Sequence, residues 1–213
     1  MKILALDLDG TLVDSSMQIY KSLATACSDF LGVQISPTLV SDNLGLPILS
    51  ILERTPIPAE SHFEVVSRFR KNLEEEILQG STLFNGVIEF LSIAKEMNLM
   101  LAIATSKPTY LAKLVVQHSE LNKHIDFVQG TDGFPPKPNP EIFTRIQASG
   151  MGEVIAMIGD RVEDIQAAQH ASIRSIGIAQ SAHSTKVLER AGADYTFGSI
   201  ADMLASNVLK GLS

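Results

Sequence analysis

The segment MKILALDLDGT (residues 1–11) is an apolar run that stops at two carboxylates placed two residues apart. A short apolar run bounded by a glycine predicts a fully buried strand. Side chains at positions i and i+2 of a strand point to the same side, so we expect Asp7 and Asp9 to crowd each other. Buried carboxylates are costly unless a cation offsets their charge or one of them keeps its proton. The segment therefore predicts a buried strand whose end carries a pair of candidate functional carboxylates.

Taken alone, the pattern Asp-x-Asp-Gly-Thr also fits a plain turn after an edge strand. It does not fit a calcium-binding EF-hand loop, which needs glycine at its sixth position and glutamate at its twelfth, because Gly10 is the fourth residue of the motif. The choice between a turn and a site depends on the rest of the chain.

The composition is that of a globular protein whose surface is acidic. The chain has 213 residues, of which 45% are hydrophobic and 19% charged, and its formal net charge is −7. This length suits one large domain, or one domain that carries an insertion. A net negative charge disfavours nucleic acid and anionic membranes as partners, because both are bound by basic patches. A small anionic substrate remains compatible with a local positive charge.

Nothing in the sequence predicts export or a membrane span. Asp7 and Asp9 interrupt the N-terminal apolar stretch, which a secretory signal would need intact. The longest apolar run, residues 99–104, is far shorter than the ~20 residues of a membrane span. The single cysteine, Cys27, can form no disulfide within one chain. We expect a cytoplasmic protein.

Hydrophobic periodicity divides the chain into two kinds of structure. Residues 15–81 repeat their apolar positions at helical spacing, which predicts an all-helical insertion, or cap. Residues 1–14 and 82–213 are predicted to form an α/β core with a Rossmann-like parallel sheet, because strands and helices alternate there. After the first strand, the predicted strands are 99–104, 125–128, 154–158, 173–178 and 194–196.

Ligands of such sheets bind outside the carboxyl ends of the strands. The polar residues expected at that edge are Asp7, Asp9, Thr105, Ser106, Lys137, Asp160 and Asp164. Clustered carboxylates without cysteine or histidine form an oxygen-only site, which suits Mg²⁺ better than zinc. Together with a lysine and a hydroxyl, they form a set of groups suited to phosphoryl transfer.

Four segments, DLDGT (7–11), TSK (105–107), KP (137–138) and GDRVED (159–164), resemble in order the four motifs of the haloacid dehalogenase superfamily. The chain is most similar to its phosphoglycolate phosphatase-like branch, with a C1-type helical cap inserted after the first motif. The resemblance covers nearly the whole chain. It implies a Mg²⁺-dependent phosphatase that hydrolyses a small phosphorylated metabolite.

The resemblance also implies roles for individual residues. Asp7 would be the nucleophile that forms an aspartyl-phosphate, and Asp9 would be the general acid and base. Thr105, Ser106 and Lys137 would bind the phosphoryl group, although relatives often have asparagine where Ser106 stands.

The implied metal ligands are carboxylates and one carbonyl. Asp7, the backbone carbonyl of Asp9, and Asp160 would bind Mg²⁺, and Asp164 would be a further ligand or would anchor the others. Dehalogenases of the superfamily lack the second aspartate, and its sugar-phosphate mutases commonly carry Glu-Asp where Gly159-Asp160 stands. A mutase or phosphotransferase, and a phosphate-binding regulator without catalysis, remain alternatives. No motif indicates the substrate or the oligomeric state.

Overall fold

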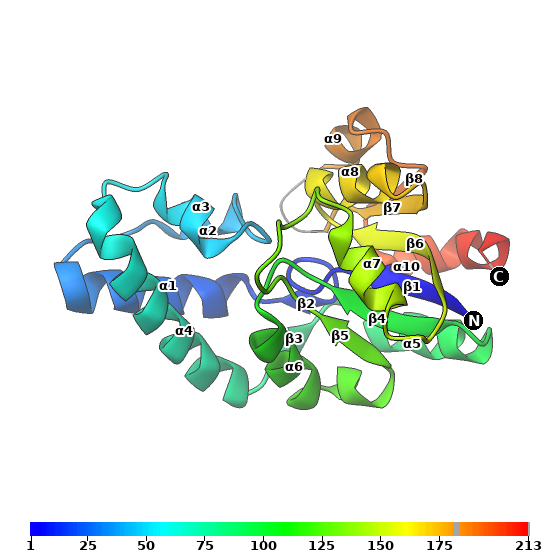
Figure 1. Cartoon of the computed structure of the whole chain (residues 1–213), viewed down its shortest axis with the longest axis horizontal. Coiled ribbons are helices and arrows are strands. Elements are labelled where there is room, and N and C mark those ends of the chain that lie inside the picture. Colours follow the sequence, from blue (N-terminus) through cyan, green and yellow to red (C-terminus); the bar gives the residue numbers. More distant parts are fainter. Residues whose placement is uncertain (181–183, 213) are drawn as a thin grey trace.

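The computed structural model describes residues 1–180 and 184–212. Its main sheet has six strands, all parallel, with β1 and β6 at the centre (Figure 1). Their order across the sheet is β5 (Phe127–Gln129), β4 (Met100–Ala104), β1 (Lys2–Leu6), β6 (Glu153–Gly159), β7 (Arg174–Ile178) and β8 (Tyr195–Phe197). The predicted α/β class and parallel sheet are confirmed.

β1 is buried on both faces, as its continuous apolar run predicts. Ile3 and Ala5 pack with apolar side chains of α7 and α8, whereas Leu4 and Leu6 belong to the larger core on the opposite face. The helices around the sheet are α5 (Val87–Glu96), α6 (Thr109–Gln117), α7 (Glu141–Gln147), α8 (Val162–His170), α9 (Thr185–Arg190) and α10 (Ile200–Ala205). Short 3₁₀ turns, η2 (Glu120–Lys123) and η3 (Val208–Gly211), complete this part of the chain.

Residues 15–81 are helical, and Figure 1 shows their helices extending away from the main sheet. They comprise α1 (Ser16–Leu31), α2 (Pro37–Ser41), α3 (Ile48–Leu52), the 3₁₀ turn η1 (Ala59–Ser61) and α4 (His62–Leu78). We call residues 15–81 the cap. The proposed domain boundaries at residues 14 and 82 stay a prediction.

A two-stranded antiparallel ladder flanks the cap, and the sequence did not predict it. β2 (Val13–Asp14) pairs with β3 (Thr82–Leu83), so the chain enters and leaves the cap through two adjacent segments. Two residues are too few to produce a detectable alternation, which explains why periodicity missed this ladder.

Two further details differ from the sequence predictions. The helical spacing of Ile19, Leu23, Ala26, Cys27 and Phe30 predicts that Phe30 lies on the apolar face of α1. Its side chain is instead 38% exposed, and the guanidinium of Arg68 lies 4.9 Å from its ring centre. The sequence also predicts a helix over residues 200–209. The helix ends at Ala205 and is followed by η3, because Asn207 adopts a left-handed φ of 59° that a helix cannot contain. In the described residues, no helix is long and apolar enough to span a membrane.

Candidate active site

The two aspartates after β1 are buried and pair with different lysines. The N–H of Asp7 donates to the carbonyl of Ile158 at 2.8 Å, which extends the pairing of β1 with β6 by one residue. The Asp7 side chain is 4% exposed and the Asp9 side chain 7%. Asp7 faces Lys137, and Asp9 faces Lys107, each at 2.7 Å. Each carboxylate therefore has a cation beside it, which is one of the two ways of offsetting buried charge that the sequence argument left open.

Lys137 is the buried cation of the first pair. Its Nζ donates to Asp7 Oδ1 at 2.7 Å, to Asp164 Oδ1 at 2.5 Å and to the carbonyl of Ala104 at 2.8 Å. An ammonium group has three donors, so all of them are used. Burial acts to lower the pKa of Lys137, but the carboxylates of Asp164 and Asp7 outweigh burial and raise this pKa above its ordinary value. Lys137 is therefore held as a cation.

Asp7, Asp160 and Asp164 form a buried cluster that could hold a metal ion. Each offers a carboxylate oxygen within 4.8 Å of the other two. Burial raises the pKa of Asp7 from 3.8 to about 8; the charge of Lys137 opposes this shift, and those of Asp164 and Asp160 add to it. One lysine therefore does not compensate the negative charge of the cluster. Its oxygen-only chemistry fits a hard divalent cation.

The chain fixes the two carboxylates that follow β6. A threonine after a glycine turn can direct its hydroxyl to the local backbone, but the Thr11 hydroxyl instead donates to Asp160 Oδ1 at 2.9 Å. The N–H of Arg161 donates to Asp164 Oδ2 at 3.0 Å, so Asp164 also closes the first turn of α8. A Cβ on Gly159 would lie 2.2 Å from Asp164 Oδ2, so only glycine lets this carboxylate approach the strand end.

Lys107 and Thr105 organise the surroundings of Asp9. Lys107 Nζ lies 2.7 Å from both carboxylate oxygens of Asp9, and its side chain is 5% exposed. The N–H of Lys107 donates to Thr105 Oγ1 at 3.2 Å, which leaves the hydroxyl proton of Thr105 available to another acceptor. From the sequence, Lys107, the last residue of the TSK segment, could serve either an electrostatic role or ion pairing, and the structure shows it paired with Asp9.

A contact between cap and core, which sequence reasoning did not identify, lies beside the cluster. Arg161 Nη1 donates to the carbonyl of Leu44 at 2.6 Å, and its Nε donates to Glu163 at 3.2 Å. A Cβ on Gly45, whose φ is 86°, would lie 2.7 Å from Cδ of Arg161. Gly45 therefore lets the cap backbone lie directly against this arginine. No local pattern could indicate a partner 117 residues away.

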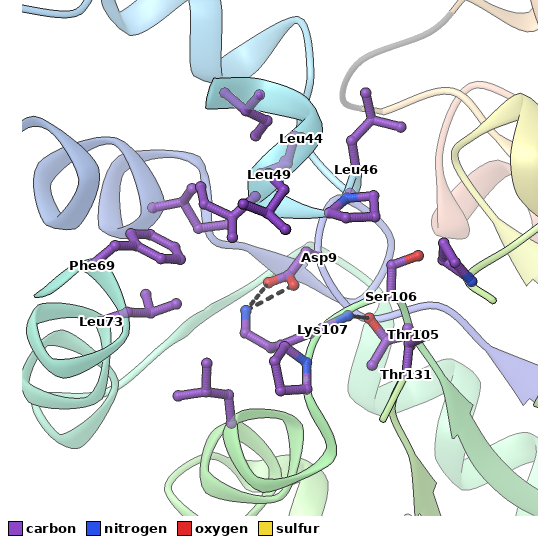
Figure 2. A pocket seen from close by; sticks show the side chains of 18 of the residues that line it. Asp9, Leu44, Leu46, Leu49, Phe69, Leu73, Thr105, Ser106, Lys107 and Thr131 are labelled. Carbon is purple, nitrogen blue, oxygen red and sulfur yellow. Dashed lines mark hydrogen bonds and ion pairs between the residues drawn. The ribbon is translucent and has the colours of Figure 1, made fainter. Parts of the chain in front are cut away.

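Two cavities meet at this edge of the sheet. The smaller one, of about 10 Å³, is lined by Asp7, Ser106, Lys137 and Asp164 together with cap residues. The larger one, of about 210 Å³, lies between cap and core, and Figure 2 shows the Asp9–Lys107 pair, Thr105 and Ser106 along it. The structure thus brings all seven predicted site residues to this edge, with Asp160 and Asp164 in the carboxylate cluster.

The comparisons with known proteins agree with this geometry. Residues 4–178 match the family described as haloacid dehalogenase-like hydrolase. The chain is 30% identical over 195 residues to the protein named "Probable phosphatase IndB" of Dickeya dadantii, with 87% of this chain and 84% of the relative covered. It is 29% identical to a phosphoglycolate phosphatase of Chromobacterium violaceum, with 95% of each protein covered. A solved structure described as a predicted phosphatase from Clostridium acetobutylicum has a TM-score of 0.85 at 27% identity, with 98% of each chain covered.

Fold and site together define a hydrolase that acts on phosphate esters and is built on a parallel α/β sheet. The chain belongs to the haloacid dehalogenase-like hydrolase family. Relatives named phosphoglycolate phosphatase confirm the resemblance drawn from the four sequence motifs.

Proposed function

We propose that this phosphatase hydrolyses a small phosphomonoester through an aspartyl-phosphate on Asp7, with Mg²⁺ as its cofactor. The observation that carries the proposal is the arrangement around Asp7. Its carboxylate lies 2.7 Å from the buried Lys137 and within a cluster of three carboxylates, while Asp9, two residues on, is held apart by its own lysine. Two aspartates in separate environments suit two separate roles.

The reaction has two halves. In the first, an Asp7 carboxylate oxygen attacks phosphorus and the bond from phosphorus to the ester oxygen breaks. Asp9, which has to separate from Lys107 and take up a proton before it can act as an acid, gives that proton to the departing alkoxide. In the second, Asp9 takes a proton from a water molecule that attacks phosphorus, the Asp7–phosphorus bond breaks, and inorganic phosphate leaves. Asp7 returns to its carboxylate form and Asp9 to its acid form.

Three groups are placed to hold the phosphoryl oxygens. Lys137 supplies positive charge next to Asp7, Thr105 has a hydroxyl proton to donate, and Ser106 lines both cavities. Donors fixed before the reaction stabilise the charge that develops in the transition state. The buried lysine is the strongest of these groups, because charge acts most effectively where water is excluded.

The proposed metal site consists of Asp7, Asp160, the backbone carbonyl of Asp9 and, as a ligand or an anchor, Asp164. Both Asp164 oxygens accept hydrogen bonds, one from Lys137 and one from the Arg161 N–H, which favours the anchoring role. A bound Mg²⁺ would neutralise phosphoryl oxygens and screen the repulsion between phosphate and carboxylate.

We further propose that the cap moves relative to the core. The cavity beside Asp7 has about 10 Å³, at most the space of one water molecule, so a phosphoryl group enters only if the cap withdraws. The hinges would be the paired segments β2 and β3, next to Asp14 and Thr82. A cross-link across these segments that leaves turnover intact would overturn this idea. The cytoplasmic location stays a prediction from the sequence.

The experiment measures phosphate release from an aryl phosphate and a panel of phosphomonoesters, with Mg²⁺ or with EDTA. We expect turnover that needs Mg²⁺ and is lost in Asp7→Asn. A matched control is Asp29→Asn, an exposed aspartate at the end of α1, which should retain full activity. Mass spectrometry of an acid-quenched reaction should find phosphate on Asp7 of the wild type.

Two outcomes would favour the alternatives. Transfer of the phosphoryl group to an added alcohol in preference to water would indicate a phosphotransferase or mutase. Phosphate binding without turnover, in protein whose unfolding remains cooperative, would indicate a regulator without catalysis.

A further inference from the structure

The larger cavity differs in chemistry between its two walls. Its core wall is polar and carries the Asp9–Lys107 pair, whereas the cap wall is mostly apolar (Figure 2). The apolar wall is formed mainly by Leu46, Ile48, Leu49, Phe69 and Leu73, with Leu111 contributed by α6. Apolar surface that lines a cavity gains free energy when an apolar group covers it.

This cavity continues into the smaller one beside Asp7. Gly45, Leu46, Pro47 and Ser106 line both. A phosphoryl group bound at Asp7 would therefore direct the alcohol part of its ester past these four residues and into the larger cavity. None of the four carries a charge.

The cations near this path either have partners within the protein or are exposed to water. Lys107 is held by both oxygens of Asp9. The guanidinium of Arg161 donates to a cap carbonyl and to Glu163. Arg70 also lines the larger cavity, but it is exposed and lines a second groove, between the cap and Tyr110 of α6, where water screens its charge. A carboxylate one carbon from the ester oxygen would lie between uncharged residues and the Asp9–Lys107 pair, which is neutral as a whole and offers it no unpaired cation.

We propose that the substrate is the phosphate monoester of an alcohol whose body is apolar and uncharged, and that phosphate esters of small hydroxy acids are poor substrates. The inference rests on the proposed function, because it assigns the leaving group of that same reaction. At about 30 Å³ for each water-sized atom, 210 Å³ accommodates roughly seven non-hydrogen atoms, the size of a benzyl group.

The first test compares kcat/KM for benzyl phosphate, a series of n-alkyl phosphates and 2-phosphoglycolate. We expect kcat/KM to rise by up to about fourfold for each methylene group until the cavity is full. Benzyl phosphate should exceed 2-phosphoglycolate by at least about tenfold. Turnover that needs Asp7 and Mg²⁺ but prefers 2-phosphoglycolate would overturn this inference and leave the proposed function intact.

The second test replaces part of the apolar wall without opening the core. Leu49 is 50% exposed, so Leu49→Gln should fold normally while lowering the ratio of kcat/KM for benzyl phosphate to that for methyl phosphate by about fivefold. Leu78→Gln is the matched control, since Leu78 is also on the cap and 54% exposed but does not line the cavity. Equal ratios in the two variants would contradict the assignment.

The third test does not depend on turnover. Calorimetry would compare the binding of 2-phenylethylphosphonate with that of 3-phosphonopropionate, which replace the ester oxygens of benzyl phosphate and 2-phosphoglycolate by methylene groups. We expect the phenyl compound to bind at least about tenfold more tightly. If no ester is hydrolysed, the proposed function fails but this comparison still decides the nature of the cavity, and equal or reversed affinities would refute the apolar assignment.

Discussion

The pairing of Asp9 with Lys107 offers a direct measurement of how strongly the site depends on buried charge. Lys107→Met keeps most of the side-chain volume and removes the cation. It leaves a carboxylate that is 7% exposed without its partner. Breaking a buried pair in this way typically costs about 3 to 5 kcal/mol. We expect Lys107→Met to lower the free energy of unfolding by about 3 kcal/mol, the lower end of this range, because Asp9 also lines the larger cavity, where water can reach it in part.

The matched control is an ion pair of the same length in a more exposed place. Lys95 lies 2.7 Å from Asp126, with side chains 35% and 23% exposed. Lys95→Met should cost less than about 1 kcal/mol. For a chain of this size, a loss of 3 kcal/mol lowers the melting temperature by about 6 to 12 °C, which thermal unfolding monitored by circular dichroism resolves easily.

A double variant completes the experiment. Asp9→Asn with Lys107→Met removes both charges, so its stability should return to within about 1.5 kcal/mol of the wild type. The reasoning would be refuted if Lys107→Met lost no more stability than Lys95→Met. It would also be refuted if removing the second charge restored nothing.

Three further predictions concern metal, pH and the cap. In EDTA, the stability of Asp7→Asn relative to that of the wild type should rise by about 2.5 kcal/mol from pH 5.5 to pH 7.5, measured by urea unfolding. In the wild type, the folded pKa of the Asp7 carboxyl, about 8, lies above the unfolded value of 3.8. Only the folded state therefore keeps the proton in this range, and the stability of the wild type falls as pH rises. Parallel plots of stability against pH for the two proteins would contradict this. Mg²⁺ at a hundred times its Kd should stabilise the wild type by about 2.7 kcal/mol, seen as a higher melting temperature, and Asp160→Asn should lose most of this gain. Arg161→Met should lower kcat/KM by about tenfold and speed amide exchange at Gly45 and Leu46, since the contact with the Leu44 carbonyl is lost; unchanged exchange would argue against its role in holding the cap.

The parts of the fold that could be predicted are those with a local signal. The apolar run of β1 identified a strand buried on both faces, and the alternation of strands and helices after residue 83 identified the parallel sheet. The rule that ligands bind at the carboxyl ends of parallel strands then gathered residues from four distant segments. Asp7, Lys137 and Asp164, which the structure joins by direct contacts, were all predicted in this way.

The parts that could not be predicted depend on contacts between distant residues. Asp7 and Asp9 were expected to crowd each other, but which lysine each one faces is set by partners 130 and 98 residues away. The contact of Arg161 with the Leu44 carbonyl involves a backbone group, which has no sequence signature. The apolar cavity likewise forms only where cap and core meet.

The charge balance of the site explains why two neighbouring aspartates can do different work. Asp9 and Lys107 form a pair that is neutral by itself. Asp7 shares one lysine with Asp160 and Asp164, so three carboxylates face a single ammonium group. Burial, opposed by Lys137 and aided by the charges of Asp164 and Asp160, raises the pKa of Asp7. A divalent cation would bring the charge of this cluster to balance. The fold therefore carries an electrostatic cost at the proposed nucleophile that cofactor binding would relieve, whereas Asp9 is already stabilised within the protein.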